Sequence, residues 1–86
     1  MYLVSNKPKA DEIFQKLAKK NPKQFEIVAK KLHQILDNPY RFKPLSNVMK
    51  GHRRVHIDKS FVLIYSIDEK NKTVILEDYD HHDKIY

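Results

Sequence analysis

The chain has 86 residues, of which 41% are hydrophobic and 33% are charged, and its net charge is +6 at neutral pH. This length suits one small domain over residues 1–86 and leaves little material for a second core. The lack of cysteine excludes a disulfide framework and a cysteine-ligated zinc site. The sequence contains no apolar run that could cross a bilayer and does not begin with a signal peptide, so we expect a cytoplasmic protein without a membrane partner.

The excess positive charge is concentrated in one segment. Residues 41–59 contain six basic side chains and one acidic side chain, Asp58. A focused basic patch favours a polyanionic partner such as nucleic acid, although charge alone also fits a merely solvated surface. The six basic residues are Arg41, Lys43, Lys50, Arg53, Arg54 and Lys59.

The first half of the chain predicts one strand and two helices. Residues 2–4 are β-prone, and Ser5 or Asn6 is expected to cap the helix that follows. Asn21-Pro22 separates two stretches with apolar residues at helical spacing, and because this link is short the helices should form an antiparallel hairpin. The two apolar stripes are Ala10, Ile13, Phe14, Leu17 and Ala18, and then Phe25, Val28, Ala29, Leu32, Ile35 and Leu36.

The second half predicts a sheet. Residues 40–48 lack periodicity and indicate a loop, after which Gly51, the only glycine, marks a tight backbone position. Two β-prone segments separated by residues 58–60 predict a β-hairpin, and residues 73–76 predict a last strand that the tail extends before folding over the sheet. The expected fold is a small α+β domain of order β-α-α-β-β-β, with an antiparallel sheet covered on one face by the helical hairpin.

The first strand of the hairpin carries the candidate site. Val55 and Ile57 supply its apolar face, and Arg53 lies on that same side by alternation. Arg54 and His56 therefore point away from the core. Cations and imidazoles on an open sheet face suit the binding and cleavage of a phosphate backbone.

The whole chain resembles the RelE/ParE superfamily of toxin–antitoxin toxins, through the pattern KPL…KG-x-RR-V-H-I…VLIYSID…TVILEDYDHHDKIY. It is most similar to the YafQ type, which has a histidine two residues after the strand arginine and a tail histidine before the C-terminal aromatic. Arg54 and His56 match the first pair, and His82 and Tyr86 match the second.

Two positions depart from the YafQ pattern. Lys43 stands where that branch has a histidine before Pro-Leu, and Ser60-Phe61 replaces an Asp-Trp pair, which removes one acid/base candidate. These departures concern the catalytic set and leave the fold assignment intact.

The resemblance implies a ribosome-dependent endoribonuclease that cuts mRNA and is neutralised by a cognate antitoxin, in a heterotetramer or larger complex. It implies no metal or other cofactor, because the 2′-hydroxyl of the RNA attacks its own neighbouring phosphate on a 70S-type ribosome. Two other functions stay open, inhibition of DNA gyrase as in ParE, and non-catalytic binding of nucleic acid. Paired imidazoles on the basic face favour the nuclease.

The reaction implied by the resemblance assigns roles to the candidate residues. Arg54 would stabilise the phosphorane, with a surface ion pair to the acidic tail as its alternative. His56 and His82 would transfer protons, His81 competes with His82, and Tyr86 either contacts the RNA or seals the core. The RNA-binding candidates are Lys43, Lys50, His52, Arg53, Lys59 and Phe61.

The tail also carries carboxylates and imidazoles that could bind a divalent ion. In a continuous strand, however, Asp78, Asp80 and His82 would share one face while His81 and Asp83 pointed away. We therefore expect no catalytic metal, and an acidic tail that moderates the basic patch.

Overall fold

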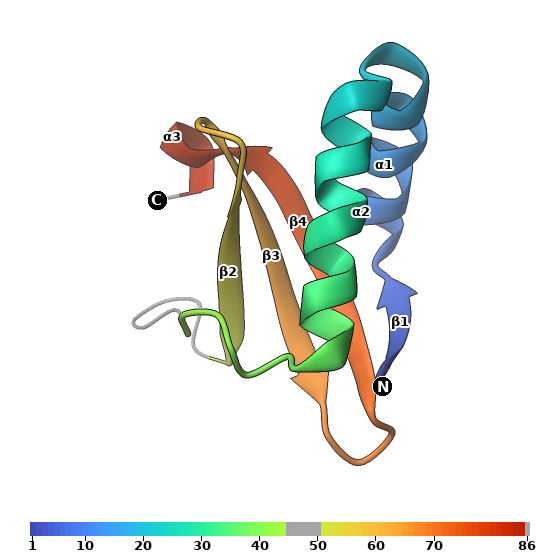
Figure 1. Ribbon diagram of the computed structural model, residues 1–86, viewed down its shortest axis with the longest axis vertical. Helices are drawn as coiled ribbons and strands as arrows, with labels where there is room; N and C mark the ends of the chain where they lie inside the picture. Colours follow the sequence, from blue (N-terminus) through green and yellow to red (C-terminus); the bar gives the residue numbers. More distant parts are fainter. Residues whose placement is uncertain (45–50, 86) are drawn as a thin grey trace.

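Four strands form one mixed sheet in the part of the chain that the computed structural model describes, residues 1–44 and 51–85 (Figure 1). The order across the sheet is β1-β4-β3-β2. The elements are β1 (Leu3–Asn6), α1 (Pro8–Lys20), α2 (Pro22–Asp37), β2 (His52–Ile57), β3 (Phe61–Asp68), β4 (Thr73–His81) and α3 (His82–Ile85). The predicted β-α-α-β-β-β order is confirmed, and one short helix follows it.

The direction of β1 differs from the expected antiparallel arrangement. β2, β3 and β4 pair antiparallel, whereas β1 pairs parallel with β4. The helical hairpin returns the chain to the start of β1, where the Tyr2 amide donates a 3.0 Å hydrogen bond to the Leu36 carbonyl. β1 and β2 therefore begin near the same end of the sheet, and the two reversals after β2 make β4 run parallel to β1.

The two long helices begin as their prolines suggest, but only one has a side-chain cap. Ser5 and Asn6, predicted to cap the first helix, instead belong to β1, and Lys7 occupies the cap position without a side-chain bond. Asn21 does cap α2, where its side chain accepts a 3.2 Å bond from the Gln24 amide. Among residues 1–44 and 51–85, no helix combines the length and the apolar character needed to cross a membrane.

The core lies between one face of the sheet and the hairpin of α1 and α2. Both predicted apolar stripes contribute to it, except that Ala18 is exposed. Ala18 lies in the last turn of α1, next to the link between the two helices. The most buried core side chains include Ala10, Val28, Ile35, Ile57, Leu63, Tyr65 and Val74.

The face of the sheet opposite the helices is partly covered rather than open. Val62 and Ile64 alternate with core residues along β3 and so face away from the helices, yet they are 0% and 1% exposed. α3 packs against β3 and β4 and lies beside the β2–β3 turn (Figure 1). The tail thus folds over the sheet, as the sequence predicts.

Candidate functional site

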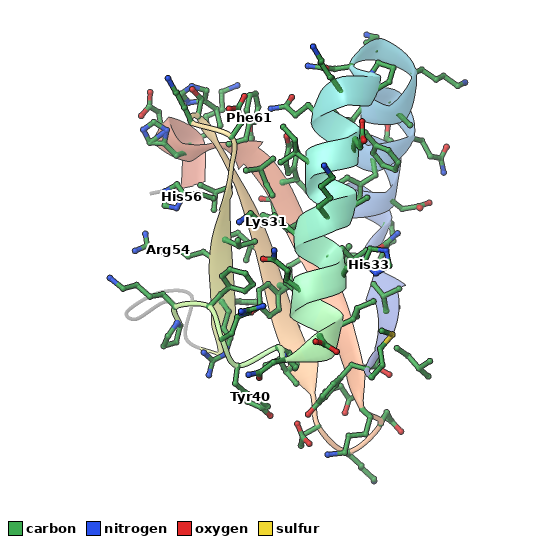
Figure 2. The ribbon with its side chains drawn as sticks, in the orientation of Figure 1. Lys31, His33, Tyr40, Arg54, His56 and Phe61 are labelled. Atoms are coloured by element: carbon green, nitrogen blue, oxygen red, sulfur yellow. The ribbon has the colours of Figure 1, made fainter. Side chains whose placement is uncertain are left out.

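Three predicted site residues share one face of β2. His52, Arg54 and His56 alternate along the strand with Arg53 and with the buried residues Val55 and Ile57, which are 4% and 0% exposed. Figure 2 shows Arg54 and His56 projecting away from α1 and α2. His56 is exposed, while His52 and Arg54 are half-buried. The predicted alternation of this strand is confirmed, and it places one guanidinium between two imidazoles.

His82 is held against the turn between β2 and β3. The turn is the predicted one, and Asp58 within it adopts a positive φ of 56°. The His82 amide donates a 2.8 Å bond to the Ser60 carbonyl, and His82 Nδ1 lies 3.3 Å from the same oxygen. A carbonyl can only accept, so Nδ1 must carry the proton for this bond to form. His82 Nε2 is then the nitrogen that remains to exchange a proton, and it lies 3.0 Å from an Asp83 oxygen.

Phe61 and His81 form an aromatic cluster at the same end of the sheet. Phe61 stacks on Tyr79 with ring centroids 5.4 Å apart and meets His81 edge-on at 5.6 Å. His81 in turn stacks on His82 at 5.0 Å. Phe61 is half-buried and packed against the core, and burial raises the pKa of the Tyr79 hydroxyl to about 12. Phe61, predicted to bind RNA, thus takes part in core packing and also orders the tail histidines.

Arg53 lies on the opposite face from Arg54 and fastens the loop that follows α2. Its Nη1 donates hydrogen bonds of 2.7 Å to the Phe42 carbonyl and 3.5 Å to the Tyr40 carbonyl, and its guanidinium lies 5.1 Å from the Tyr40 ring centroid. The prediction that Arg53 binds RNA did not anticipate this arrangement, because the sequence does not show where the loop passes.

The same loop lies along the edge of β2 and brings Lys43 to the site. Pro44 forms an isolated antiparallel bridge with Arg53, and the Arg54 amide donates a 3.1 Å bond to the Lys43 carbonyl. Lys43 is exposed. Two residues eleven positions apart in the sequence, Lys43 and Arg54, are therefore neighbours in space.

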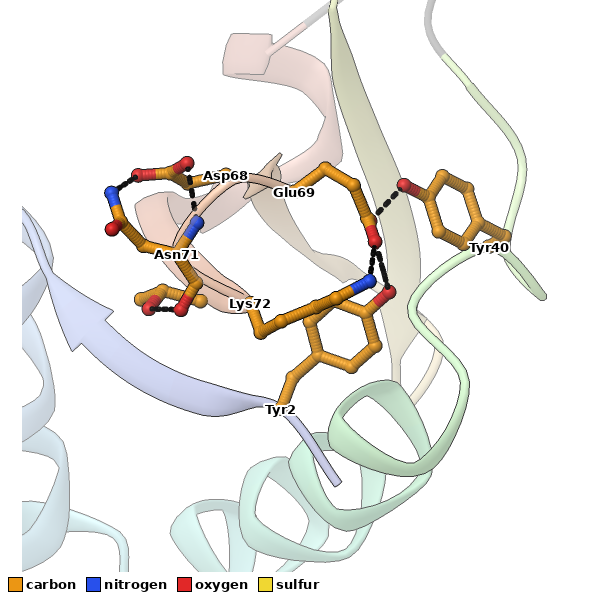
Figure 3. A network of polar contacts seen from close by, with 7 residues as sticks. Tyr2, Tyr40, Asp68, Glu69, Asn71 and Lys72 are labelled. Atoms are coloured by element: carbon orange, nitrogen blue, oxygen red, sulfur yellow. Dashed lines mark hydrogen bonds and ion pairs between the residues drawn. The ribbon is translucent and has the colours of Figure 1, made fainter.

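Two further anchors fix the start of this loop. The buried Tyr65 hydroxyl donates a 2.6 Å bond to the Pro39 carbonyl, and burial raises its pKa to about 12. Glu69, in the β3–β4 turn, accepts hydrogen bonds from the hydroxyls of Tyr2 and Tyr40 and from Lys72 (Figure 3). These donors, Lys72 first, lower the pKa of Glu69 to about 2. The N-terminus, the loop and the β3–β4 turn are thereby tied together.

Glu77 is a residue near the site that the sequence analysis missed. The pairing of β3 with β4 shifts between Ile64 and Tyr65, which leaves Glu77 as an extra residue in β4. Its carboxylate accepts a 2.6 Å bond from the Ser66 hydroxyl and lies 3.6 Å from His52 Nε2. The sequence contains no signal for this bulge. Strict alternation along β4 therefore assigns the side chains after the bulge to the wrong face of the sheet.

The acidic tail extends β4 only as far as His81, so the alternation considered for a continuous strand does not apply to the residues after it. β4 ends at His81 and α3 begins at His82, so the side chains of His81, His82 and Asp83 gather instead of alternating. Among the described residues, these three form the group whose donor atoms could hold a metal ion. Asp78, in contrast, pairs with Lys9 at 3.1 Å.

The remaining predicted site residues are placed as follows. Lys59 is exposed in the β2–β3 turn. Gly51, which was predicted to mark a tight backbone position and not a site residue, precedes β2 with a positive φ of 91°. Lys50 and Tyr86 lie outside the described residues. The structure therefore brings together Lys43, Arg54 and His56 on β2 and its edge, and His81 and His82 at the adjoining turn.

Comparison with known proteins identifies related sequences. Residues 4–86 match the profile of the ParE toxin of the type II toxin–antitoxin system parDE. A Methanosarcina mazei protein without an assigned function is 56% identical over the full length of both chains. A Methanocaldococcus jannaschii protein, named RelE4 and proposed to be a toxin, is 48% identical over all of this chain and 92% of its own length.

Solved structures share the fold. The YoeB/ParE toxin from Agrobacterium tumefaciens is similar with a TM-score of 0.86 at 11% identity, covering 93% of this chain and 98% of that one. A chain of the RelBE2 toxin–antitoxin complex from Mycobacterium tuberculosis has a TM-score of 0.78 at 25% identity, covering 94% and 98%. YafQ from Escherichia coli BL21(DE3) has a TM-score of 0.71 at 22% identity, covering 100% and 99%.

Proposed function

The chain belongs to the ParE toxin family of type II toxin–antitoxin systems, within the RelE/ParE superfamily, and we propose that it is a ribosome-dependent endoribonuclease that cleaves translated mRNA. One observation carries this proposal. Arg54 and His56 project together from the face of β2 that points away from the helices, and His82 is fastened at the turn that ends β2. A cation flanked by imidazoles is the set of groups that cleavage by an RNA 2′-hydroxyl needs.

In the proposed reaction, the 2′-oxygen attacks its own neighbouring phosphorus. One imidazole, from His56 or His82, accepts the proton of the 2′-hydroxyl while the new P–O bond forms. Arg54 stabilises the added negative charge of the phosphorane through charge-assisted hydrogen bonds. The other imidazole donates a proton to the 5′-oxygen as its bond to phosphorus breaks. The products are a 2′,3′-cyclic phosphate and a free 5′-hydroxyl.

The surrounding basic residues would hold the RNA or ribosomal RNA backbone. Lys43, exposed next to Arg54, and Lys59, exposed in the turn, are suited to phosphate contacts. Loss of either should weaken binding without abolishing the chemical step. His52 is less suited, because Glu77 lies 3.6 Å from its Nε2.

We also propose a cognate antitoxin as partner and the cytoplasm, where ribosomes are, as location. The Mycobacterium tuberculosis relative was solved as a toxin–antitoxin complex. An acidic segment of the antitoxin would cover Arg54 and the basic face and so exclude RNA. Co-expression with the product of the adjacent reading frame should yield a stable complex, and failure to associate would count against this partner.

Primer extension on a reporter mRNA after brief induction tests the nuclease proposal. Wild type should produce discrete cuts within translated codons, and the His56→Ala, His82→Ala double variant should produce none. His33→Ala is the matched control, since His33 is exposed on α2, on the other side of the sheet from Arg54 (Figure 2), and its loss should leave the cuts unchanged. Cuts that persist in the double variant would refute the assignment of both histidines.

The match to the ParE profile favours a second candidate, inhibition of DNA gyrase. The same experiment separates the two, because a gyrase inhibitor would arrest growth while the reporter mRNA stayed intact. Its toxicity should largely survive the double replacement. Intact mRNA together with normal growth would indicate a non-catalytic binding module.

A further inference from the structure

Three consecutive side chains with metal-binding atoms meet where β4 gives way to α3. The donor atoms of His81, His82 and Asp83 all lie within 4.8 Å of one another. The two imidazoles are 38% and 41% exposed and the carboxylate is 73% exposed, so an ion can reach them from solvent. The change from strand to helix creates this cluster, because a continuous strand would direct adjacent side chains to opposite faces.

The spacing of these atoms fits a small tetrahedral cation. The two oxygens of Asp83 lie 3.5 Å from His81 Nδ1 and 3.0 Å from His82 Nε2. A tetrahedral ion with bonds of about 2.0–2.2 Å separates its ligand atoms by roughly 3.4 Å. The ligand atoms of the two imidazoles lie within 4.8 Å of each other, so these partly exposed side chains would draw closer around one ion, whose fourth position stays open to water.

Each imidazole already has a contact outside the cluster, His82 with the Ser60 carbonyl and His81 with the Phe61 ring. The bond from His82 Nδ1 to the Ser60 carbonyl leaves Nε2 as the nitrogen directed at Asp83. Imidazoles that bind metals commonly have this arrangement, in which the second nitrogen donates to a backbone carbonyl. The His81 ring is confined between Phe61 and His82, although its Nδ1 accepts a 3.3 Å bond from the Asp83 amide, which an ion would replace.

We propose that His81, His82 and Asp83 form a site for a divalent transition-metal ion such as Zn²⁺, and that the bound ion inhibits the protein. Two imidazoles and one carboxylate favour Zn²⁺ over Mg²⁺, which prefers a shell of oxygen ligands. An ion on His82 Nε2 occupies the nitrogen that would otherwise exchange a proton with RNA. The inhibitory part rests on the proposed nuclease function, whereas the binding part does not.

Calorimetric titration of the full chain without an affinity tag tests the binding. Wild type should bind one Zn²⁺ with a saturable isotherm and should bind Mg²⁺ at least tenfold more weakly. Asp83→Asn and His81→Gln should each weaken Zn²⁺ binding at least tenfold. His33→Gln, which removes an exposed histidine on α2, should bind Zn²⁺ as wild type does. Absence of saturable binding, or unchanged affinity in both Asp83→Asn and His81→Gln, would overturn the site.

Two further measurements test the effect on His82. Addition of Zn²⁺ should shift the ¹⁵N resonance of His82 Nε2, a readout that needs neither RNA nor ribosomes, and an unmoved resonance would refute ligation by this nitrogen. Zn²⁺ should also slow RNA cleavage at least tenfold in wild type. In Asp83→Asn, Zn²⁺ should slow cleavage much less, when the rate with Zn²⁺ is compared with the same variant's rate without Zn²⁺. Equal inhibition of wild type and Asp83→Asn would refute inhibition through this site.

Discussion

Replacing Arg53 by methionine should destabilise the protein strongly, although Arg53 is one of two adjacent arginines in a basic segment. Methionine keeps the apolar stem and removes the guanidinium, which donates 2.7 Å and 3.5 Å hydrogen bonds to the Phe42 and Tyr40 carbonyls. A hydrogen bond from a charged group contributes about 1.5–3 kcal/mol. The contact of the guanidinium with the Tyr40 ring, at 5.1 Å, adds about 0.5–1 kcal/mol.

The expected loss is therefore about 2–3 kcal/mol in the free energy of unfolding, since these contributions overlap. For a domain of this size, that corresponds to a Tm lower by about 10–20 °C. Urea and thermal unfolding followed by circular dichroism measure both quantities.

Lys59→Met is the matched control for the Arg53 variant. Lys59 is also cationic and was also predicted to bind RNA, but it is exposed in the β2–β3 turn. Its replacement should change stability by less than about 0.5 kcal/mol. If Arg53→Met is as stable as Lys59→Met and instead loses affinity for RNA, then Arg53 is an RNA contact and its assignment to the loop is wrong.

Three other predictions concern the frame around the site. Tyr65→Phe should lower the free energy of unfolding by about 1–3 kcal/mol, because the buried Pro39 carbonyl loses its 2.6 Å donor. Tyr79→Phe should leave stability unchanged or raise it, because the buried Tyr79 hydroxyl has no partner among the described residues. Equal losses of unfolding free energy in the two variants would contradict this. Gly51→Ala should lower the free energy of unfolding in urea by roughly 1–2 kcal/mol. An added Cβ meets no atom of the described residues within 4 Å, but a φ of 91° strains any L-residue, and unchanged stability would mean that this φ is not retained. The pKa of Glu69 is lowered in the folded state, from 4.5 to about 2, so its network adds stability that is complete above pH 4.5 and is lost as the pH falls toward 2. The difference in urea midpoint between wild type and Glu69→Gln should be constant from pH 7 to about 5 and should shrink at lower pH. A difference that does not depend on pH would refute the network.

The local sequence determined most of the elements and the faces of β2. Apolar residues at helical spacing located α1 and α2, and Pro22 after Asn21 marked where one helix ends and the next begins. Alternation around Val55 and Ile57 placed Arg54 and His56 on one face. These features depend on spacings of a few residues, so the chain alone specifies them.

The tertiary structure decided which chemical groups meet. The Tyr2–Leu36 contact lies where the parallel strand β1 begins, the loop after α2 engages Arg53, and the bulge turns Glu77 toward His52. Likewise, the end of β4 at His81 gathers the tail histidines around Asp83. Such arrangements depend on contacts between segments far apart in the chain and on breaks in strand alternation. Both are set by how the sheet and helices pack together, which no periodicity in the sequence records.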